Sequence, residues 1–174
     1  MSKIKPKVIE VDEIVVKFAG DSGDGMQLSG SQFSDTTAFT GNDLSTFPDF
    51  PSEIRAPQGT IAGVSGFQIH IGHKEVTTPG DKADVLVALN PAALKANIKW
   101  VKPGATIIVD IDYFDNKGYK KAGFVEDPLN DGSLTGYNVV KAPITSLSKA
   151  SVRDLGLDNK SAERTRNEFA LGIL

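Results

Sequence analysis

The chain carries, at residues 13–28, the stretch EIVVKFAGDSGDGMQL, in which an apolar run ends in a glycine-rich loop and a helix-like segment follows. This is the pattern of a β-strand, a tight turn and a helix N-terminus. Glycines in such a turn adopt positive φ and let a ligand approach the backbone, while the free N–H groups of the helix start point toward it. The stretch therefore predicts an α/β unit with a ligand cleft at residues 20–25.

The loop differs from the dinucleotide-binding pattern GxGxxG, because Ser22 occupies the second glycine position. It also contains two acids, Asp21 and Asp24. At about 6 Å from a phosphate, each would repel it by about 3 kcal/mol at an effective dielectric of about 20, which matches the ~1.5–3 kcal/mol of one charged hydrogen bond. A phosphate cradle is therefore one reading of the loop, and a turn required by helix-to-strand packing is the other.

Length and composition limit the possible functions. The 174 residues fit one domain, and the net charge of −3 gives no sign of a nucleic-acid groove. The chain has no cysteine, which excludes a disulfide, a catalytic thiol and an iron–sulfur cluster held by this chain. Residues 1–7 lack the apolar stretch of a signal peptide, and no apolar run has the length of a membrane span, so we expect a cytoplasmic location.

Strand and helix patterns alternate along the chain. Apolar and alternating runs predict strands at residues 14–19, 44–47, 61–71, 84–89, 105–111 and 137–144, and helical patterns cover residues 26–39 and 91–101. The polar alternation in residues 61–71 indicates an antiparallel strand near an edge, whereas the continuous apolar run 84–89 indicates a central parallel strand. The pattern predicts an α/β fold, a Rossmann-like three-layer sandwich around a mostly parallel sheet.

A second helix start follows the strand that ends at Leu89. Asn90 is a favourable N-cap and Pro91 a favourable first helical residue. In a doubly wound sheet this strand lies beside the first strand, where the strand order reverses. We therefore expect the glycine loop and Asn90 to flank one crevice.

Other candidate residues each have two readings. Arg55 lies in a proline-rich loop, residues 48–60, and either grips a phosphate or carboxylate or pairs with a nearby acid. Lys17 either points into the cleft or extends to solvent from its strand. Asp110 and Asp112 follow an apolar strand, where they either contact ligand or cap the next helix.

The chain has no pattern for chemistry of its own. Its two histidines, His70 and His73, lack the ligand spacing of a metal site and are expected at the surface. There is no GxSxG elbow and no P-loop pattern. We expect no catalytic residue and no metal site in this chain.

Several motifs together resemble one family, the 2-oxoacid:ferredoxin oxidoreductases, in their gamma-type region. They are GDSGDGMQLSG at 20–30, FPSEIRAPQGT at 50–60, GVSGFQ at 63–68, ADVLVALNPAAL at 83–94 and NEFALG at 167–172. The resemblance covers nearly the whole chain and is greatest to the alpha subunit of the enzymes that use 2-oxoglutarate, in which the gamma-type region comes first. Ser22 departs from the pattern, since many members have a third glycine there.

The resemblance implies a role in the coenzyme A-dependent oxidative decarboxylation of a 2-oxoacid. The cofactors it implies are thiamine diphosphate, Mg²⁺ and iron–sulfur clusters in other regions or subunits, with ferredoxin as electron acceptor. The implied partners of this chain are the remaining alpha-type region and the beta subunit. Chain 1–174 would be one gamma-type, coenzyme A-binding domain, inactive alone, with a thiamine-binding-type domain following Leu174. The implied binding residues are Gly20, Asp21, Ser22, Gly23, Asp24, Gly25, Met26, Arg55 and Asn90.

Two other functions remain open at this point. One is an NAD- or FAD-dependent oxidoreductase that uses the same loop for a dinucleotide, although Ser22 and the absence of an acid closing the second strand disfavour it. The other is a structural assembly domain whose loop packs against a partner without a ligand. The apolar end at Ile173 and Leu174 is consistent with further polypeptide or a partner at this surface.

Overall fold

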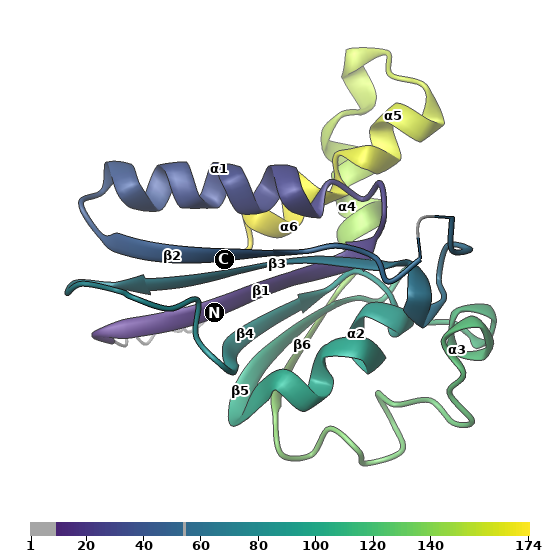
Figure 1. Cartoon of the computed structure of the whole chain (residues 1–174). Coiled ribbons are helices and arrows are strands. Elements are labelled where there is room, and N and C mark those ends of the chain that lie inside the picture. Colours follow the sequence, from purple (N-terminus) through teal and green to yellow (C-terminus); the bar gives the residue numbers. More distant parts are fainter. Residues whose placement is uncertain (1–9, 54) are drawn as a thin grey trace, which may run out of the picture.

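A computed structural model describes residues 10–53 and 55–174 (Figure 1). Its strands are β1 Glu13–Asp21, β2 Asp43–Asp49, β3 Val64–Gly72, β4 Ala83–Ala88, β5 Val101–Asp110 and β6 Asn138–Ala142. Its α-helices are α1 Met26–Phe39, α2 Pro91–Asn97, α3 Asn116–Ala122, α4 Ile144–Ser151, α5 Asn159–Arg164 and α6 Arg166–Leu171. Three 3₁₀ turns complete these elements: η1 Ile61–Gly63, η2 Ile98–Trp100 and η3 Arg153–Leu155.

The six strands form one sheet in the order β2-β3-β1-β4-β5-β6. Strands β1, β4, β5 and β6 are parallel neighbours, whereas β3 pairs antiparallel with both β1 and β2. The prediction of a mostly parallel sheet is confirmed, as is the antiparallel strand near an edge. β1 and β4 lie side by side, with Val16 opposite Val85 and Ala19 opposite Ala88.

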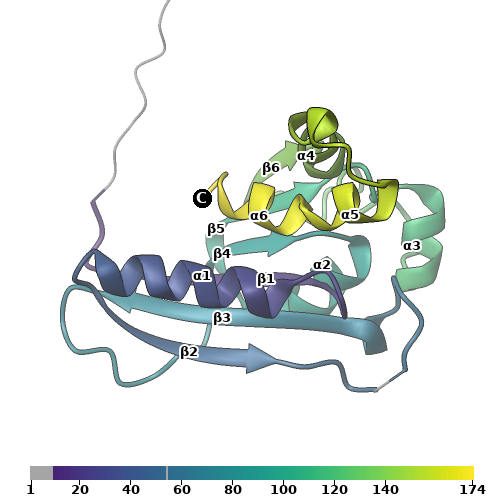
Figure 2. The ribbon, with the colours of Figure 1, turned by 90° about the horizontal axis from the view of Figure 1, so that it is seen from above.

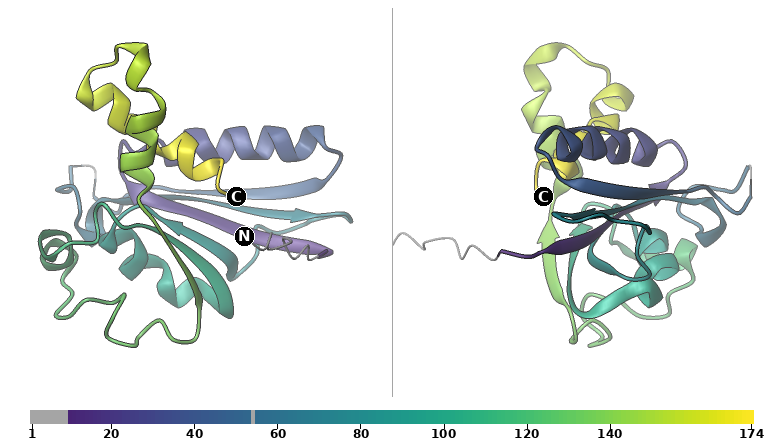
Figure 3. Two further views of the ribbon diagram at one scale, coloured as in Figure 1. Left: turned by 180° about the vertical axis from the view of Figure 1, so that it is seen from behind. Right: turned by 60° about the vertical axis from the view of Figure 1, so that its left-hand side comes forward.

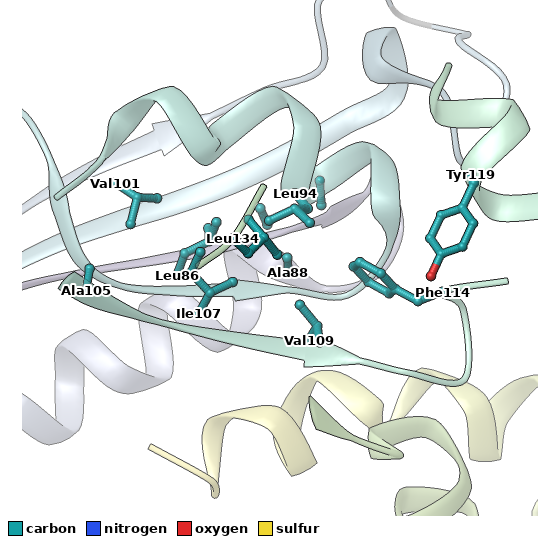
Figure 4. Packing of buried hydrophobic residues seen from close by; sticks show 12 residues of the cluster. Leu86, Ala88, Leu94, Val101, Ala105, Ile107, Val109, Phe114, Tyr119 and Leu134 are labelled. Atoms are coloured by element: carbon teal, nitrogen blue, oxygen red, sulfur yellow. The ribbon is translucent and has the colours of Figure 1, made fainter. Parts of the chain in front are cut away.

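Helices cover both faces of the sheet, which gives the three layers expected from the sequence. Helices α1, α4 and α6 lie over one face and α2 over the other, and Figures 2 and 3 show α6 beside α1. On the α2 face, Leu94 packs on Leu86 and Ile107 of the sheet (Figure 4). On the α1 face, Phe18 meets the ring of Phe33 edge-on, with the two ring centres 5.8 Å apart.

The structure corrects several element boundaries. Strand β3 begins only at Val64, because residues 61–63 form the turn η1. Strand β2 continues through Pro48 rather than ending before it, since an edge strand tolerates a residue without an N–H. Helix α2 ends at Asn97, before the predicted end at residue 101, and β5 begins at Val101, before the predicted start at residue 105. Gly104, with a φ of 78°, lies inside β5.

The predicted alternation of strand and helix fails between β2 and β4. Among the described residues between β2 and β3, the turn η1 is the only helical element, and residues 73–82, which connect β3 to β4, contain no helix. Part of this connection is hydrogen-bonded to β3, where Gln68 Nε2 donates to the carbonyls of Pro79 and Gly80 at 2.8 and 2.6 Å. A single strand, β3, is thus inserted between β1 and β2.

The carboxyl ends of β1 and β4 bring the two predicted helix starts to one edge of the sheet. The N–H of Leu89 donates to the carbonyl of Ala19 at 2.9 Å, which joins β4 to β1 near their carboxyl ends. Strand β1 leads into the glycine loop, residues 20–25, and β4 leads into Asn90. Within residues 10–53 and 55–174, no helix is long and apolar enough to cross a membrane.

Candidate functional site

Two cavities adjoin at this edge of the sheet. The larger, called here the cleft, has a volume of about 540 Å³ and is lined by Asp21, Ser22, Gly23, Asp24, Gln58, Tyr113, Asn159, Lys160, Glu163, Arg164 and Arg166. The smaller, called here the side pocket, has a volume of about 250 Å³ and is lined by Asp21, Gln58, Gly59, Asn90, Pro91, Asp112, Tyr113, Asp115, Lys117, Gly118 and Lys121. Asp21, Gln58 and Tyr113 line both. The predicted crevice is therefore present, but the glycine loop and Asn90 face adjoining spaces.

Hydrogen bonds within the protein hold the glycine loop in shape. The N–H of Asp21 donates to Asp24 Oδ2 at 2.8 Å, and the N–H of Asp24 donates to the carbonyl of Asp21 at 2.9 Å. The N–H of Ser22 donates to the carbonyl of Gly63 at 3.0 Å. Three amides that a phosphate cradle would need are therefore used by the protein itself.

Positive φ angles bring the chain from the loop into α1. Gly23 has a φ of 101° and Gly25 a φ of 79°, a region that L-residues with a side chain avoid. A Cβ on Gly25 would also lie 2.4 Å from Nδ2 of Asn167, whereas a Cβ on Gly23 would meet no atom within 4 Å. Gly25 thus lets α6 approach α1, and Gly23 leaves the backbone open toward the cleft.

Asp21 is a buried acid in the wall between the two cavities. Its carboxylate oxygens accept the N–H of Gly59 at 3.0 and 2.9 Å. Burial raises the pKa of Asp21, while the Gly59 N–H and the nearby Asn90 amide act in the opposite direction. Asn90 Oδ1 caps α2 by accepting the N–H of Ala93 at 2.8 Å, but its buried Nδ2 has no hydrogen-bond partner in the described part of the chain.

A buried ion pair joins the glycine loop to α6. Arg166 Nη2 donates to Asp24 Oδ1 at 2.5 Å, and the two side chains are only 7% and 10% exposed. Burial opposes the charge of Arg166, but the Asp24 carboxylate outweighs it and raises the pKa of Arg166. Since Asp24 Oδ2 also accepts the N–H of Asp21, one carboxylate fixes the loop and anchors α6.

Tyr113 crosses the space between the β5–α3 connection and the C-terminal helices. Its hydroxyl donates to Glu163 Oε1, and its ring lies 4.4 Å from Cζ of Arg166. Burial and the bond to Glu163 raise the pKa of Tyr113 to about 12. The hydrogen bond from Tyr113 lowers the pKa of Glu163. Burial acts against this shift, and Lys149 adds to it. Tyr113 therefore stays protonated and closes one side of the cleft.

The structure separates the residues predicted to bind ligand. Asp21, Ser22, Gly23 and Asp24 line the cleft, and Asn90 lines the side pocket. Gly20 and Met26 are buried behind the loop, and Met26 packs in the hydrophobic core. Gly25 faces a third cavity of about 360 Å³ on the other side of the loop.

The structure places the residues for which the sequence left a ligand-binding and a structural role open. Arg55 is exposed in the loop before η1 and lines neither the cleft nor the side pocket. Lys17 is buried, with Nζ 3.1 Å from Oδ2 of Asp49 on β2, and it lines neither the cleft nor the side pocket. Asp110 accepts the hydroxyl of Thr145 at 2.5 Å and so stabilises the start of α4.

The remaining polar candidates are also accounted for by local contacts. Asp112 accepts the N–H of Ser146 at 2.6 Å, and it also lines the side pocket. His70 is partly buried, with Nδ1 2.8 Å from the carbonyl of Thr78, whereas His73 is exposed. Among residues 10–53 and 55–174, no group of three or more His, Cys, Asp or Glu side chains is placed to hold a metal ion.

Sequence reasoning missed the far wall of the cleft. Tyr113, Glu163 and Arg166 all lie far from the glycine loop in sequence, and the Arg166–Asp24 contact spans 142 residues. Arg166 stands close to the apolar residues at the C-terminal end of the sequence, but its local sequence does not identify a partner 142 residues away.

Comparisons with known proteins show which family the chain resembles. A family model described as pyruvate ferredoxin/flavodoxin oxidoreductase matches residues 15–174. The chain is 48% identical over 164 residues to the 2-oxoglutarate oxidoreductase subunit KorA of Mycobacterium tuberculosis, a match that covers 94% of this chain and 25% of that protein. The chain thus spans about a quarter of the length of this relative.

Two solved structures share the fold at low sequence identity. The 2-oxoglutarate:ferredoxin oxidoreductase of Magnetococcus marinus, with 2-oxoglutarate, coenzyme A and succinyl-CoA bound, matches with a TM-score of 0.64 and 22% identity over 91% of this chain and 23% of that one. The gamma subunit of a keto/oxoacid ferredoxin oxidoreductase from Geobacter sulfurreducens matches with a TM-score of 0.60 and 19% identity over 91% of this chain and 73% of that one. The family match over residues 15–174 shows that the chain belongs to the pyruvate ferredoxin/flavodoxin oxidoreductase family.

Proposed function

We propose that the chain is the non-catalytic, coenzyme A-binding gamma-type domain of a cytoplasmic 2-oxoacid:ferredoxin oxidoreductase that uses 2-oxoglutarate. The observation that carries this proposal is the 48% identity to the M. tuberculosis subunit across 94% of this chain. The complete enzyme would carry out the coenzyme A-dependent oxidative decarboxylation of the 2-oxoacid. The chain alone would have no turnover.

The redox and thiamine chemistry would belong to other regions or subunits. Iron–sulfur clusters are held by cysteine thiolates, and this chain has no cysteine, so it does not fit such a cluster. Thiamine diphosphate and Mg²⁺ would lie in a thiamine-binding-type region and the beta subunit, and ferredoxin would accept the electrons. This chain's part would be to bind and orient coenzyme A.

The cleft supports coenzyme A binding by its size and chemistry. Its volume of about 540 Å³ is within the usual ~300–1,000 Å³ of small-molecule sites. Its lining includes Gly23, where a Cβ would meet no atom within 4 Å, and the cations Lys160 and Arg164. The adjoining side pocket adds Lys117 and Lys121, so an extended anionic ligand meets basic groups along both cavities.

The loop geometry disfavours the NAD or FAD alternative. In a dinucleotide site the loop amides bind the pyrophosphate, whereas here the amides of Asp21, Ser22 and Asp24 are bonded within the protein. The assembly-domain alternative predicts no ligand at all. A melting experiment separates the three functions.

The test compares coenzyme A, NAD and FAD as stabilisers of the purified chain. At 100 times its dissociation constant, a true ligand adds about 2.7 kcal/mol to the free energy of unfolding. For a chain of this size that raises the melting temperature by about 5–11 °C. We expect this shift with coenzyme A only. A shift with NAD or FAD alone, or with none of the three, contradicts the proposal.

A second test restores activity by combining the chain with the remaining subunits. Coenzyme A-dependent reduction of a viologen dye by 2-oxoglutarate is measured for wild type and for two variants of cleft residues, Arg164→Ala and Gly23→Asp. We expect both variants to require more coenzyme A for half-maximal rate. Arg153→Ala, an exposed arginine that does not line the cleft, serves as the control. Wild-type behaviour of both test variants excludes the proposed site.

A further inference from the structure

We propose that Arg166 is the phosphate-recognising side chain of the cleft, acting with the positive end of α1. The ligand would be a phosphate ester or diphosphate. Its identification as coenzyme A rests on the proposed function, whereas the subsite itself rests on the contacts of Arg166.

The first observation is an arginine with an unused donor. Arg166 is 6% exposed, and its Nη2 is taken by Asp24, but its buried Nη1 has no hydrogen-bond partner in the described part of the chain. A buried donor of a charged group without a partner destabilises the folded chain. An entering oxyanion would supply the missing acceptor through a charge-assisted bond.

The second observation is that Arg166 lies at the cleft, beside the start of α1. Arg166 lines the cleft together with Ser22, Gly23 and Asp24, and the 14-residue helix α1 begins directly after them. No side chain caps the N-terminus of α1. The partial positive charge of a helix start favours an anion there, in the same direction as Arg166.

The third observation is that Asp24, the acid next to this arginine, is already paired. Asp24 is already neutralised by Nη2 of Arg166, so the planar fork of one guanidinium can serve Asp24 with one nitrogen and a ligand with the other. The compact ammonium of a lysine lacks this fork. Arg166→Lys therefore keeps the charge beside Asp24 but removes the second donor.

Tyr113 controls access to this donor. Its ring lies 4.4 Å from Cζ of Arg166 and covers the guanidinium, and its hydroxyl is bonded to Glu163. Because Tyr113 lines both the cleft and the side pocket, its ring has space into which it can move. Phosphate binding is thus expected to displace this ring from Arg166.

The experiment titrates coenzyme A, pantetheine and inorganic pyrophosphate into the full chain, wild type and Arg166→Lys, by calorimetry. Pantetheine shares the thiol arm of coenzyme A but has no phosphate. We expect Arg166→Lys to bind coenzyme A and pyrophosphate about 10- to 100-fold more weakly, the loss expected for one charged hydrogen bond, and to bind pantetheine as wild type does. Arg153→Lys, on the exposed turn η3, should change none of the three.

Each outcome bears on a defined claim. Equal weakening of pantetheine and coenzyme A in a folded variant, or no weakening of either phosphate ligand, overturns the subsite. If wild type binds pyrophosphate through Arg166 but not coenzyme A, the subsite stands and the proposed function fails. A measurement on wild type needs no variant: the NMR signals of the Arg166 guanidinium should shift with pyrophosphate and not with pantetheine, and their insensitivity to pyrophosphate overturns the proposal.

Discussion

Asp24→Ala tests whether one carboxylate holds the glycine loop and α6 together. The substitution removes the partner of Arg166 at 2.5 Å and the acceptor of the Asp21 N–H at 2.8 Å. Both side chains of the ion pair are at most 10% exposed, so the unpaired guanidinium stays in a site that water does not reach freely. Breaking a buried pair from one side costs about 3–5 kcal/mol, which for a chain of this size lowers the melting temperature by about 6–20 °C.

The assay is urea and thermal unfolding of three variants beside wild type. Lys149→Met is the matched control, since its ion pair with Glu163 is 39% exposed on both sides and should contribute only about 0.2–1 kcal/mol. Adding Arg166→Met to Asp24→Ala removes the unpaired charge and should restore part of the free energy of unfolding that Asp24→Ala removes. If Asp24→Ala lowers the free energy of unfolding by no more than Lys149→Met does, the Asp24 carboxylate does not hold the loop and α6 together.

Two further predictions concern packing and pH. A Cβ on Gly30 would lie 2.1 Å from Cγ of Phe67, so Gly30→Ala should lower the free energy of unfolding by about 1–2 kcal/mol in spite of the better helix propensity of alanine. The control is Gly136→Ala, whose Cβ would meet no atom within 4 Å and which should leave the free energy of unfolding unchanged. Equal effects of the two substitutions contradict this packing. Burial raises the pKa of Asp110 above its usual 3.8, and the hydrogen bonds from Thr145 act in the opposite direction. Between the pKa of the unfolded chain and that of the folded chain, the folded chain therefore keeps a proton that the unfolded chain has released. The free energy of unfolding falls as pH rises through this range. The stability deficit of Asp110→Asn relative to wild type should therefore shrink as pH rises from about 3.8, and a growing deficit contradicts the shift.

The first βα unit was predictable because the residues that begin and end its helix lie next to that helix in the sequence. Glycines with positive φ at Gly25 and Gly41 bracket α1, so the predicted helix 26–39 agrees with the structure at both ends. Asn90 and Pro91 act as a cap and a first helical residue, as expected. In each case the decisive interaction lies within a few residues of the signal.

Features that depend on strand order were not predictable in the same way. Pro48 ends a strand by local rules but is accepted in β2, because β2 turned out to be an edge strand. The role of Arg166 depends on Asp24, and the role of Asp21 depends on Gly59, so neither follows from the sequence around it. The sequence therefore located one wall of the cleft, and tertiary contacts supplied the other.

Calorimetric titration of coenzyme A into wild type, Gly23→Asp and Gly41→Asp tests the coenzyme A site most directly. Both glycines have positive φ and open space around a would-be Cβ, so the two substitutions impose similar backbone strain, but only Gly23 lines the cleft. A carboxylate about 6 Å from a ligand phosphate repels it by about 3 kcal/mol, so we predict binding to wild type and Gly41→Asp and a loss of about 100-fold in Gly23→Asp. Equal affinity of the two variants, or no binding to the wild-type chain, would contradict a coenzyme A site in this cleft.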